Sequence, residues 1–411
     1  GKADTPESEA FDALEHGDAF YLAKFLLKAG LLSKERYGPG LEKASKARGK
    51  LNPLARGLRM RNRFSRSRWA CLLALISLAL PAREAQNAVS GSRPTYADTV
   101  RFLEQSTFGP TSQLIAHVQS VGFDAFLKEQ LNAPAADYPD LEFWPQTRPA
   151  TCTASCQRDN YTMYPLQRHF FLNALYGQDQ LRQRVAFALG EILVASAVDV
   201  RLPSWMRGYQ QLLYSGGFGN FRQLLYDATL NPAMGRFLDM VNNRCQTRTP
   251  PDPNVCRNGL TSQPNENYAR EVLQLFSIGT FLLNQDASRK LDRSGNPIPT
   301  YDQPTVEEFA RVFTGWTLAP ALPGPSGVGG TAPNYRDPMV IRQDAQGRES
   351  YHDRGPKTLL NGFRLPGGQP ADQELNAAID NIAYHPNVAP FISKQLIQHL
   401  VTSNPSPAYV R

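Results

Sequence analysis

Apolar residues recur at helical spacing along most of the chain after residue 95. In residues 264–279 they lie three to four positions apart, and the segment ends at a glycine. Between residues 280 and 302, turn residues separate short apolar stretches, which predicts a β-hairpin excursion. The predicted fold class is mainly α, a multi-helix globular domain with a small β-hairpin excursion. Further helices are predicted over residues 96–105, 111–121, 123–131, 166–176, 181–195, 204–214, 220–230, 379–384 and 388–401.

Two segments share the pattern Glu-x-aromatic-Ala-Arg, at residues 266–270 and 307–311. Asn265 is a good N-cap for the first, and Gly279 is a good terminator. In both segments the glutamate lies four residues before the arginine, the favourable order on a helix. Charges on such apolar helices need partners. Two interpretations stay open: two helices joined by crossed Glu–Arg pairs, or a functional site built on them.

Residues 181–195 are apolar on nearly every side, which predicts a central, buried helix. Glu191 lies within this segment. A buried carboxylate needs a cation, a hydrogen-bond donor or a proton. We expect Glu191 to form a core ion pair with an arginine; a functional acid is the alternative.

The positive charge of the chain is concentrated at its N-terminal end. Residues 1–68 hold 15 of the 44 Lys and Arg residues and 8 of the 37 Asp and Glu residues, which leaves 29 of each kind in the rest. Phosphate contacts need a basic surface. The neutral main body therefore disfavours nucleic-acid binding.

Residues 60–88 have the pattern of a secretory signal peptide. Four arginines after Met60 precede the apolar run 70–80, and small residues follow it. The run is too short to span a bilayer comfortably. We expect translation to start at Met60, residues 1–59 to be an upstream extension, and the protein to be periplasmic or secreted without a permanent membrane span. The alternative is a genuine cytoplasmic segment followed by a signal anchor.

Four cysteines remain when Cys71 leaves with the signal segment: Cys152, Cys156, Cys245 and Cys256. The simplest of the three possible connectivities joins Cys152 to Cys156 and Cys245 to Cys256. Disulfide-closed loops indicate an oxidising compartment. A four-cysteine zinc site is disfavoured, because these spacings are not those of a zinc ribbon.

Six ordered segments carry a family resemblance. They read LRQRVAFALGEILVAS, GFGNFRQLLYDATLNPAMGRFLD, NENYAREVLQLFSIG, PIPTYDQPTVEEFARVFTGW, HDRGPK and HPNVAPFISKQLIQHLV. With them the chain resembles the bacterial "domain of unknown function 1800" family over residues 96–411. The resemblance implies an exported helical domain that is incomplete at its C-terminal end here, and an exported sulfatase-like partner protein. The family has no established activity to carry over.

Several reaction classes lack their motifs. The chain has no Gly-x-Ser-x-Gly elbow, no His-Glu-x-x-His zinc helix, no Cys-x-x-Cys-His haem attachment and no dinucleotide fingerprint. Only five histidines follow the signal segment: His117, His169, His352, His385 and His399. A site made of several histidines is therefore tightly constrained.

His352 and Asp353 are the candidate catalytic residues, because they lie in a polar stretch of the kind that often carries site residues on a helical scaffold. Glu266, Glu271 or Glu308 would supply further carboxylates. A hard cation needs several oxygen ligands and an open position for water. The first hypothesis is an exported hydrolase with a carboxylate/His site; the presence and identity of a metal or cofactor are left unknown.

The second hypothesis is a non-catalytic cell-surface or assembly protein that acts with an exported partner. The two Glu-x-aromatic-Ala-Arg helices would then be structural. The hairpin at 280–302 and a Pro/Gly-rich surface loop at 319–334 would form a partner-binding face. Asp353 would then form a surface pair with Lys357 or Arg354.

The N-terminus of the exported protein tests the proposed start. Because a signal peptide is removed on export, N-terminal sequencing should give a first residue beyond Met60. A first residue before Met60 would contradict the proposed start.

Overall fold

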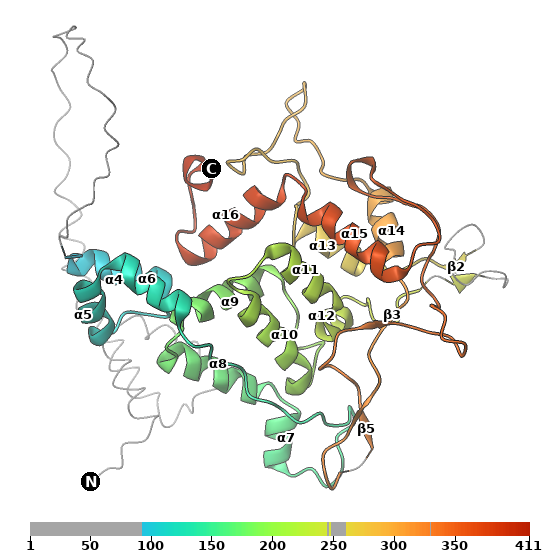
Figure 1. The fold of residues 1–411 in the computed structure, drawn as a ribbon, viewed down its shortest axis with the longest axis horizontal. Helices are drawn as coiled ribbons and strands as arrows, with labels where there is room; N and C mark the ends of the chain where they lie inside the picture. The colour runs from blue at the N-terminus through green and yellow to red at the C-terminus, as the bar shows by residue number, and fades with distance from the viewer. Residues whose placement is uncertain (1–92, 245, 248–259, 329) are drawn as a thin grey trace. The chain divides into compact units, whose positions relative to one another are not determined.

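The computed structural model describes residues 93–244, 246–247, 260–328 and 330–411. The described part is mainly α, with fourteen α-helices and only short antiparallel strand pairs, which confirms the predicted fold class (Figure 1). It divides into two compact units, residues 93–104 with 109–126, and residues 105–108 with the described residues of 127–411. The predicted signal segment, the upstream extension, Cys245 and Cys256 lie outside the described residues.

The first unit contains most of α4 (Tyr96–Ser106), all of α5 (Ser112–Val121) and the start of α6 (Phe123–Asn132). The Thr111 side chain accepts a hydrogen bond from the backbone N–H of Leu114 (3.1 Å) and so caps α5. These helices agree with the prediction to within one residue at each end. The unit has a small core of its own, made of Leu103, Ile115, Val118 and Phe126.

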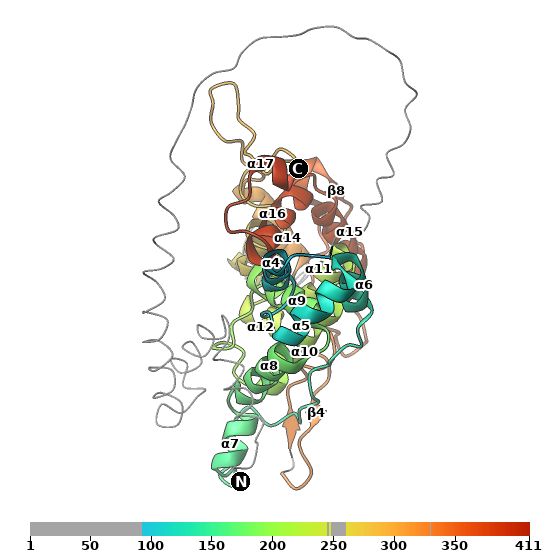
Figure 2. The same cartoon turned by 90° about the vertical axis from the view of Figure 1, so that its left-hand side faces the viewer.

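The second unit is built around α10, which contacts α7, α8, α9, α11 and α12. Figure 2 shows α7 at one end of this unit and α16 and α17 at the other. Its helices are α7 (Ala154–Asn160), α8 (Tyr164–Tyr176), α9 (Gln180–Ile192), α10 (Pro203–Gly216), α11 (Phe221–Leu230), α12 (Pro232–Phe237), α13 (Asn267–Gln274), α14 (Gln303–Val312), α15 (Ala371–Ala383), α16 (Val388–Leu400) and α17 (Pro407–Val410).

Local signals explain several of these boundaries. The Asn220 side chain accepts from the N–H of Gln223 (3.3 Å) at the start of α11, and the Asp302 side chain accepts from the N–H of Thr305 (3.0 Å) at the start of α14. After α13 the chain turns until Gly279, which has a φ of 70°. This left-handed conformation favours glycine, but α13 ends at Gln274 with Leu275 as its C-cap, so the prediction that Gly279 terminates the helix is wrong.

The prediction for Glu191 is wrong. In α9, the residues Ala188, Leu189 and Ile192 are buried, but Glu191 is exposed and Phe187 is 43% exposed. The helix therefore buries one face, and Glu191 lies outside it, where a carboxylate is hydrated without a partner. The central helix of the unit is α10, not α9.

The strands form small antiparallel pairs. The predicted excursion at 280–302 holds the isolated bridges Phe281 to Pro299, Leu283 to Arg289 and Leu291 to Pro297. The stretch expected as a surface loop at 319–334 contains a short strand pair of its own, with Leu322 and Ala332 buried. The pairs are β1 (Gln246–Thr247) with β2 (Leu260–Ser262), β3 (Trp316–Thr317) with β6 (Val340–Ile341), β4 (Leu322–Pro323) with β5 (Thr331–Ala332), and β7 (Lys357–Thr358) with β8 (Arg364–Leu365).

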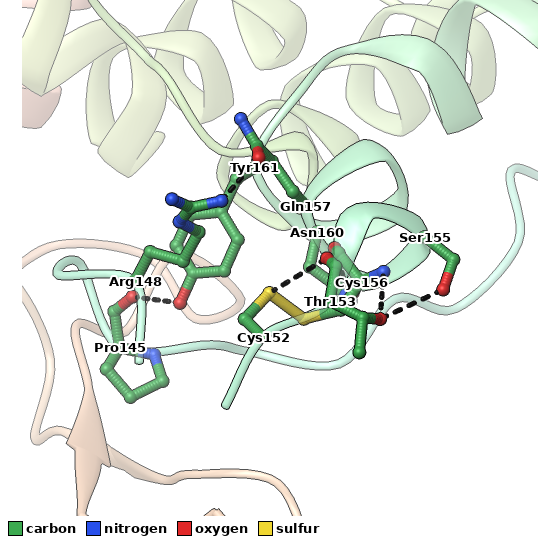
Figure 3. Close-up of a disulfide and its surroundings, with 9 residues drawn as sticks. All are labelled: Pro145, Arg148, Cys152, Thr153, Ser155, Cys156, Gln157, Asn160 and Tyr161. Carbon is green, nitrogen blue, oxygen red and sulfur yellow. Dashed lines mark hydrogen bonds between the residues drawn. A yellow bond between two sulfur atoms is a disulfide. The ribbon is translucent and has the colours of Figure 1, made fainter. Parts of the chain in front are cut away.

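A disulfide joins Cys152 and Cys156, with 5.3 Å between their Cα atoms (Figure 3). The Thr153 hydroxyl accepts from the N–H of Cys156 (3.4 Å) and caps α7, and the Asn160 side chain donates to the carbonyl of Cys156 (3.1 Å). The predicted pairing of these two cysteines is confirmed.

The aromatic residues of the two Glu-x-aromatic-Ala-Arg segments are buried in the main core. The ring of Tyr268 on α13 lies edge-on to that of Phe313, just after α14, with 4.9 Å between centroids. The Tyr268 hydroxyl also hydrogen-bonds the hydroxyl of Thr229 on α11 (2.6 Å). These contacts fix α14 and, with it, the residues that meet the 352–358 segment.

Candidate functional site

His352 and Asp353 lie in a cluster of buried charged side chains that connects α14, the segment before β7, and α15. The side chains of His352, Asp353, Lys357 and Glu374 are all 0% exposed. Arg311 of α14 completes the buried set, with its side chain 10% exposed. The charged groups of His352, Asp353 and Lys357 are therefore buried, and not on the surface as the composition of this segment suggested, whereas Arg354, Pro356 and Thr358 are exposed.

Arg311 binds the Asp353 carboxylate with two parallel hydrogen bonds. Its Nε lies 2.9 Å from Asp353 Oδ2, and its Nη2 lies 3.1 Å from Oδ1. The third nitrogen, Nη1, donates to Glu308 Oε2 (2.6 Å). Burial by itself raises the pKa of Asp353, but the hydrogen bonds and charge of Arg311 outweigh it, so this pKa lies below its usual value. Asp353 is thus held as a carboxylate without water.

All three donors of the Lys357 ammonium find acceptors. Nζ donates to Glu374 Oε2 (2.5 Å), to the carbonyl of Asp353 (2.5 Å) and to the carbonyl of Gly355 (3.0 Å). Burial lowers the pKa of Lys357, and the neighbouring Glu374 carboxylate opposes that shift. The other oxygen of Glu374, Oε1, is buried without a hydrogen-bond partner, so Lys357 is the main compensation for this carboxylate.

The imidazole of His352 bridges α14 and α15. Its Nδ1 lies 2.9 Å from the carbonyl oxygen of Thr314, and its Nε2 lies 3.2 Å from Glu374 Oε2. A carbonyl oxygen only accepts, so Nδ1 carries a hydrogen. The cluster thus brings together the acidic side chains of Asp353, Glu374 and Glu308 and the basic side chains of Arg311, Lys357 and His352.

Two glycines allow the close packing around this cluster. Gly315 has a φ of 84°, and a Cβ there would lie 2.8 Å from the backbone nitrogen of His352. A Cβ on Gly355 would lie 2.7 Å from Nη2 of Arg311. Each glycine therefore lets the backbone approach a residue of the buried cluster.

Glu266 and Glu271 belong to a different group on α13. Glu266 pairs with Arg270 at 2.6 Å, which confirms the predicted spacing of that pair. In the described part of the chain, no hydrogen bond or ion pair joins either glutamate to His352 or Asp353. The structure therefore brings the two loop candidates together but keeps the two helical ones apart from them.

The predicted crossed Glu–Arg pairs do not join α13 to α14 among the described residues. Arg311 turns to Glu308 and Asp353 instead. Gln303 connects the two helices instead. Its side-chain amide accepts a hydrogen bond from Arg270 (3.0 Å) and donates hydrogen bonds to Glu266 (3.0 Å) and to Glu307 (3.2 Å). An amide both donates and accepts, so it can bridge both charges.

Glu271 has an unsatisfied environment. Its Oε2 is buried and has no hydrogen-bond partner among the residues that the structure describes. Burial raises the pKa of Glu271, and the positive charge of Arg270 acts in the opposite direction. Glu271 is therefore a half-buried acid whose charged form is disfavoured.

A cleft of about 530 Å³ opens beside Glu308. The Glu308 side chain is 29% exposed, and its Oε2 accepts both from Arg311 and from the N–H of Thr358 (3.3 Å). Glu308 thus connects the buried cluster to solvent. None of the residues that line the cleft is basic, and its polar lining residues are Tyr301, Asp302, Thr305, Glu308, Thr358 and Asn361.

Sequence reasoning missed Glu374 as a member of the cluster. On α15, Ala371, Leu375 and Ala378 are buried, and Glu374 lies three residues after the first and four before the last. A single carboxylate on this buried face was a readable signal, because helical neighbours three and four apart share one side. The partnership of Arg311 with Asp353 had no local signal, since 42 residues separate them.

The comparison with known families gives one result. The family described as "Protein of unknown function (DUF1800)" matches residues 101–411. The chain belongs to the DUF1800 family. The match confirms the resemblance seen in the six ordered segments. No curated protein and no solved structure matches the chain.

None of the helices in the described residues of the DUF1800 chain is long and apolar enough to cross a membrane. No group of three or more His, Cys, Asp or Glu residues among them is arranged to hold a metal ion. The catalytic roles given to His352, Asp353, Glu266 and Glu271 stay predictions.

Replacing Lys357 tests the buried cluster. Lys357→Met leaves Glu374 buried without its cation, so the free energy of unfolding should fall by about 3–5 kcal/mol in urea titrations. Arg348→Met is the matched control, because it also removes the cation of an ion pair, but the side chains of Arg348 and Asp344 are 74% and 28% exposed. That change should cost less than about 1 kcal/mol.

The double variant Lys357→Met/Glu374→Gln should recover part of the loss, because it removes the uncompensated charge. Equal effects of Lys357→Met and Arg348→Met would contradict a stabilising role for the cluster.

The raised pKa of Glu271 predicts a pH-dependent stability. The folded protein binds this proton more tightly than the unfolded chain, so the contribution is favourable below the usual value of 4.5 and is lost as pH rises through the raised pKa. Glu271→Gln should therefore unfold at a higher temperature than wild type at about pH 7, and this difference in melting temperature should shrink at about pH 4.

Glu142→Gln is the control for Glu271→Gln, because Glu142 is exposed. Melting curves at both pH values make the comparison. A Glu271→Gln protein with a lower melting temperature than wild type at about pH 7 would show that the charged form of Glu271 contributes stability.

Proposed function

We propose that the protein is an exported, non-catalytic binding protein that holds a partner at the cleft beside Glu308. The observation that carries this proposal is the complete burial of the His352, Asp353, Lys357 and Glu374 side chains, next to a cleft reached by Glu308. A catalytic group must come within hydrogen-bond reach of its substrate. Groups with no exposed surface instead support the walls of the cleft.

The cleft favours a cationic partner group. Asp302 and Glu308 bring two carboxylates to it, and no lining residue is basic. Tyr301 adds an aromatic ring of the kind that attracts cations. We therefore infer that a Lys- or Arg-containing segment of an exported partner binds here. The family resemblance makes a sulfatase-like exported protein the partner to try first.

Export is part of this proposal. The arginine-rich start and short apolar run of residues 60–88 support a signal peptide. The Cys152–Cys156 disulfide supports an oxidising compartment, periplasmic or extracellular. Both features fit a protein that meets its partner outside the cytoplasm.

A hydrolase is the second candidate, favoured by the two carboxylates of the same cleft. Asp302 and Glu308 could both reach a substrate there, whereas His352 would act through Glu374 or the backbone and not on the substrate itself. In this reading the reacting carboxylates are those of the cleft, and Glu266 and Glu271 lie outside it.

Binding of a tetralysine peptide to the full chain tests the proposed function. Asp302→Asn keeps a side chain that can cap α14 but removes the charge, so affinity measured by fluorescence anisotropy should fall about two- to fivefold. Asp292→Asn is the matched control, because Asp292 also caps an exposed turn, by accepting from Ser294 and Asn296, and does not line the cleft.

The proposal fails if wild type does not bind tetralysine, or if Asp292→Asn weakens binding as much as Asp302→Asn. Turnover of phosphate or sulfate esters that is lost in Asp302→Asn and kept in Asp292→Asn would favour the hydrolase instead.

A further inference from the structure

A second pocket, of about 320 Å³, lies at the start of α10 and shares no lining residue with the cleft beside Glu308. Its walls come from the segment before α7, the segment before α10, α10 itself and the last turn of α12. The lining residues that matter here are Gln146, Asp199, Arg201, Trp205 and Arg236. None of them belongs to the buried cluster or to the two glutamates of α13.

The pocket is lined by two arginines. Arg201 and Arg236 are exposed, and in the part of the chain that the structure describes neither forms an ion pair. Asp199 is the one acidic lining residue, so the lining has an excess of positive charge. Two arginine forks at one pocket are the arrangement that proteins use for carboxylate, sulfate or phosphate groups.

A buried donor in the same pocket lacks an acceptor. Trp205 is 3% exposed, and its Nε1–H has no hydrogen-bond partner. One face of the indole stacks on Tyr335, with 4.2 Å between centroids and an angle of 2° between planes, so the ring orientation is fixed. Buried donors in proteins almost always have a partner, and the described residues supply none to this one.

The helix that carries Trp205 also points its positive end here. Leu202, the N-cap residue of α10, lines the pocket, and no side chain caps this helix. The hydroxyl of Ser204, in the first turn, is buried without a partner as well. A helix N-terminus presents a partial positive charge to an anion.

We propose that this pocket binds a small oxyanion, the carboxylate, sulfate or phosphate group of a ligand. Arg201 and Arg236 would neutralise it, and Trp205 in the pocket lining lies close enough to report its binding. The site is separate from the proposed cationic partner at the cleft. It gives the protein two openings of opposite charge preference.

The indole N–H resonance of Trp205 tests the site in the full chain. Sodium sulfate, sodium phosphate and sodium acetate are titrated separately at constant ionic strength set with chloride, and the resonance is assigned by its loss in Trp205→Phe. We expect a saturable shift of this resonance with at least one of the three. Tighter binding of sulfate or phosphate indicates that the ligand carries a tetrahedral group, and tighter binding of acetate indicates that it carries a carboxylate.

Arg201→Gln and Arg236→Gln should each lower the affinity for the anion that binds by about 10- to 100-fold, the loss typical of a charge-assisted hydrogen bond. Arg293→Gln is the matched control, because Arg293 is exposed on the 280–302 hairpin and away from the pocket lining. The indole resonances of Trp144 and Trp316 report whether each variant keeps its fold.

Two results would overturn the proposal. One is the absence of a saturable Trp205 shift with all three anions. The other is an Arg201→Gln or Arg236→Gln protein that keeps the fold and binds as tightly as Arg293→Gln. Neither result bears on tetralysine binding at the cleft, so this site and the proposed function fail independently.

Discussion

The paired hydrogen bonds between Arg311 and Asp353 allow a charged segment to pass through the core. Asp353 has no exposed side-chain surface, so its charge is stable only with the guanidinium in place. The same carboxylate accepts from the N–H of Gly355 (2.7 Å) and thereby sets the turn that brings Lys357 to Glu374. One ion pair on α14 thus decides where the next segment runs and how α15 meets it.

Buried charges of this kind do more for the choice of structure than for its stability. Apolar side chains of similar volume can replace a buried ion pair at little or no cost, whereas a single deletion is expensive. In this protein each partner has a fixed direction: the fork of Arg311 fits Asp353, and the ammonium of Lys357 meets three oxygens. A one-residue slip of the 352–358 segment would leave several charges unpaired. The cluster therefore selects one register for this segment.

The helices could be predicted because their signals are local. Thr111 and Asn220 cap helices within three residues of themselves. The buried cluster could not be predicted, because the residues that pair with the 352–358 segment come from α14 and α15, far from His352 in the sequence. The polarity of the 352–358 segment suggested exposure, and tertiary packing reversed it for His352, Asp353 and Lys357. The prediction for Glu191 was wrong in the other direction. Its apolar neighbours suggested burial, but α9 buries only one of its faces.

The overall charge of the main body conceals its local chemistry. Acidic and basic residues balance after residue 68, yet the cleft beside Glu308 has only acidic charges and the pocket at Trp205 has mainly basic ones. A neutral sum argues against binding along a polyanion, which needs an extended basic face. It does not argue against two compact sites of opposite sign, each of which recognises a single group.

The disulfide at α7 contributes less to stability than a cross-link between distant parts of the chain would. Cys152 and Cys156 are only four residues apart in the sequence. A cross-link stabilises a protein mainly by removing conformations from the unfolded chain, and a short loop removes few of them. The bridge restrains the first turn of α7, while the core around α10 rests on packing. Reduction of this bridge should therefore cost the fold little, because the core around α10 does not depend on it.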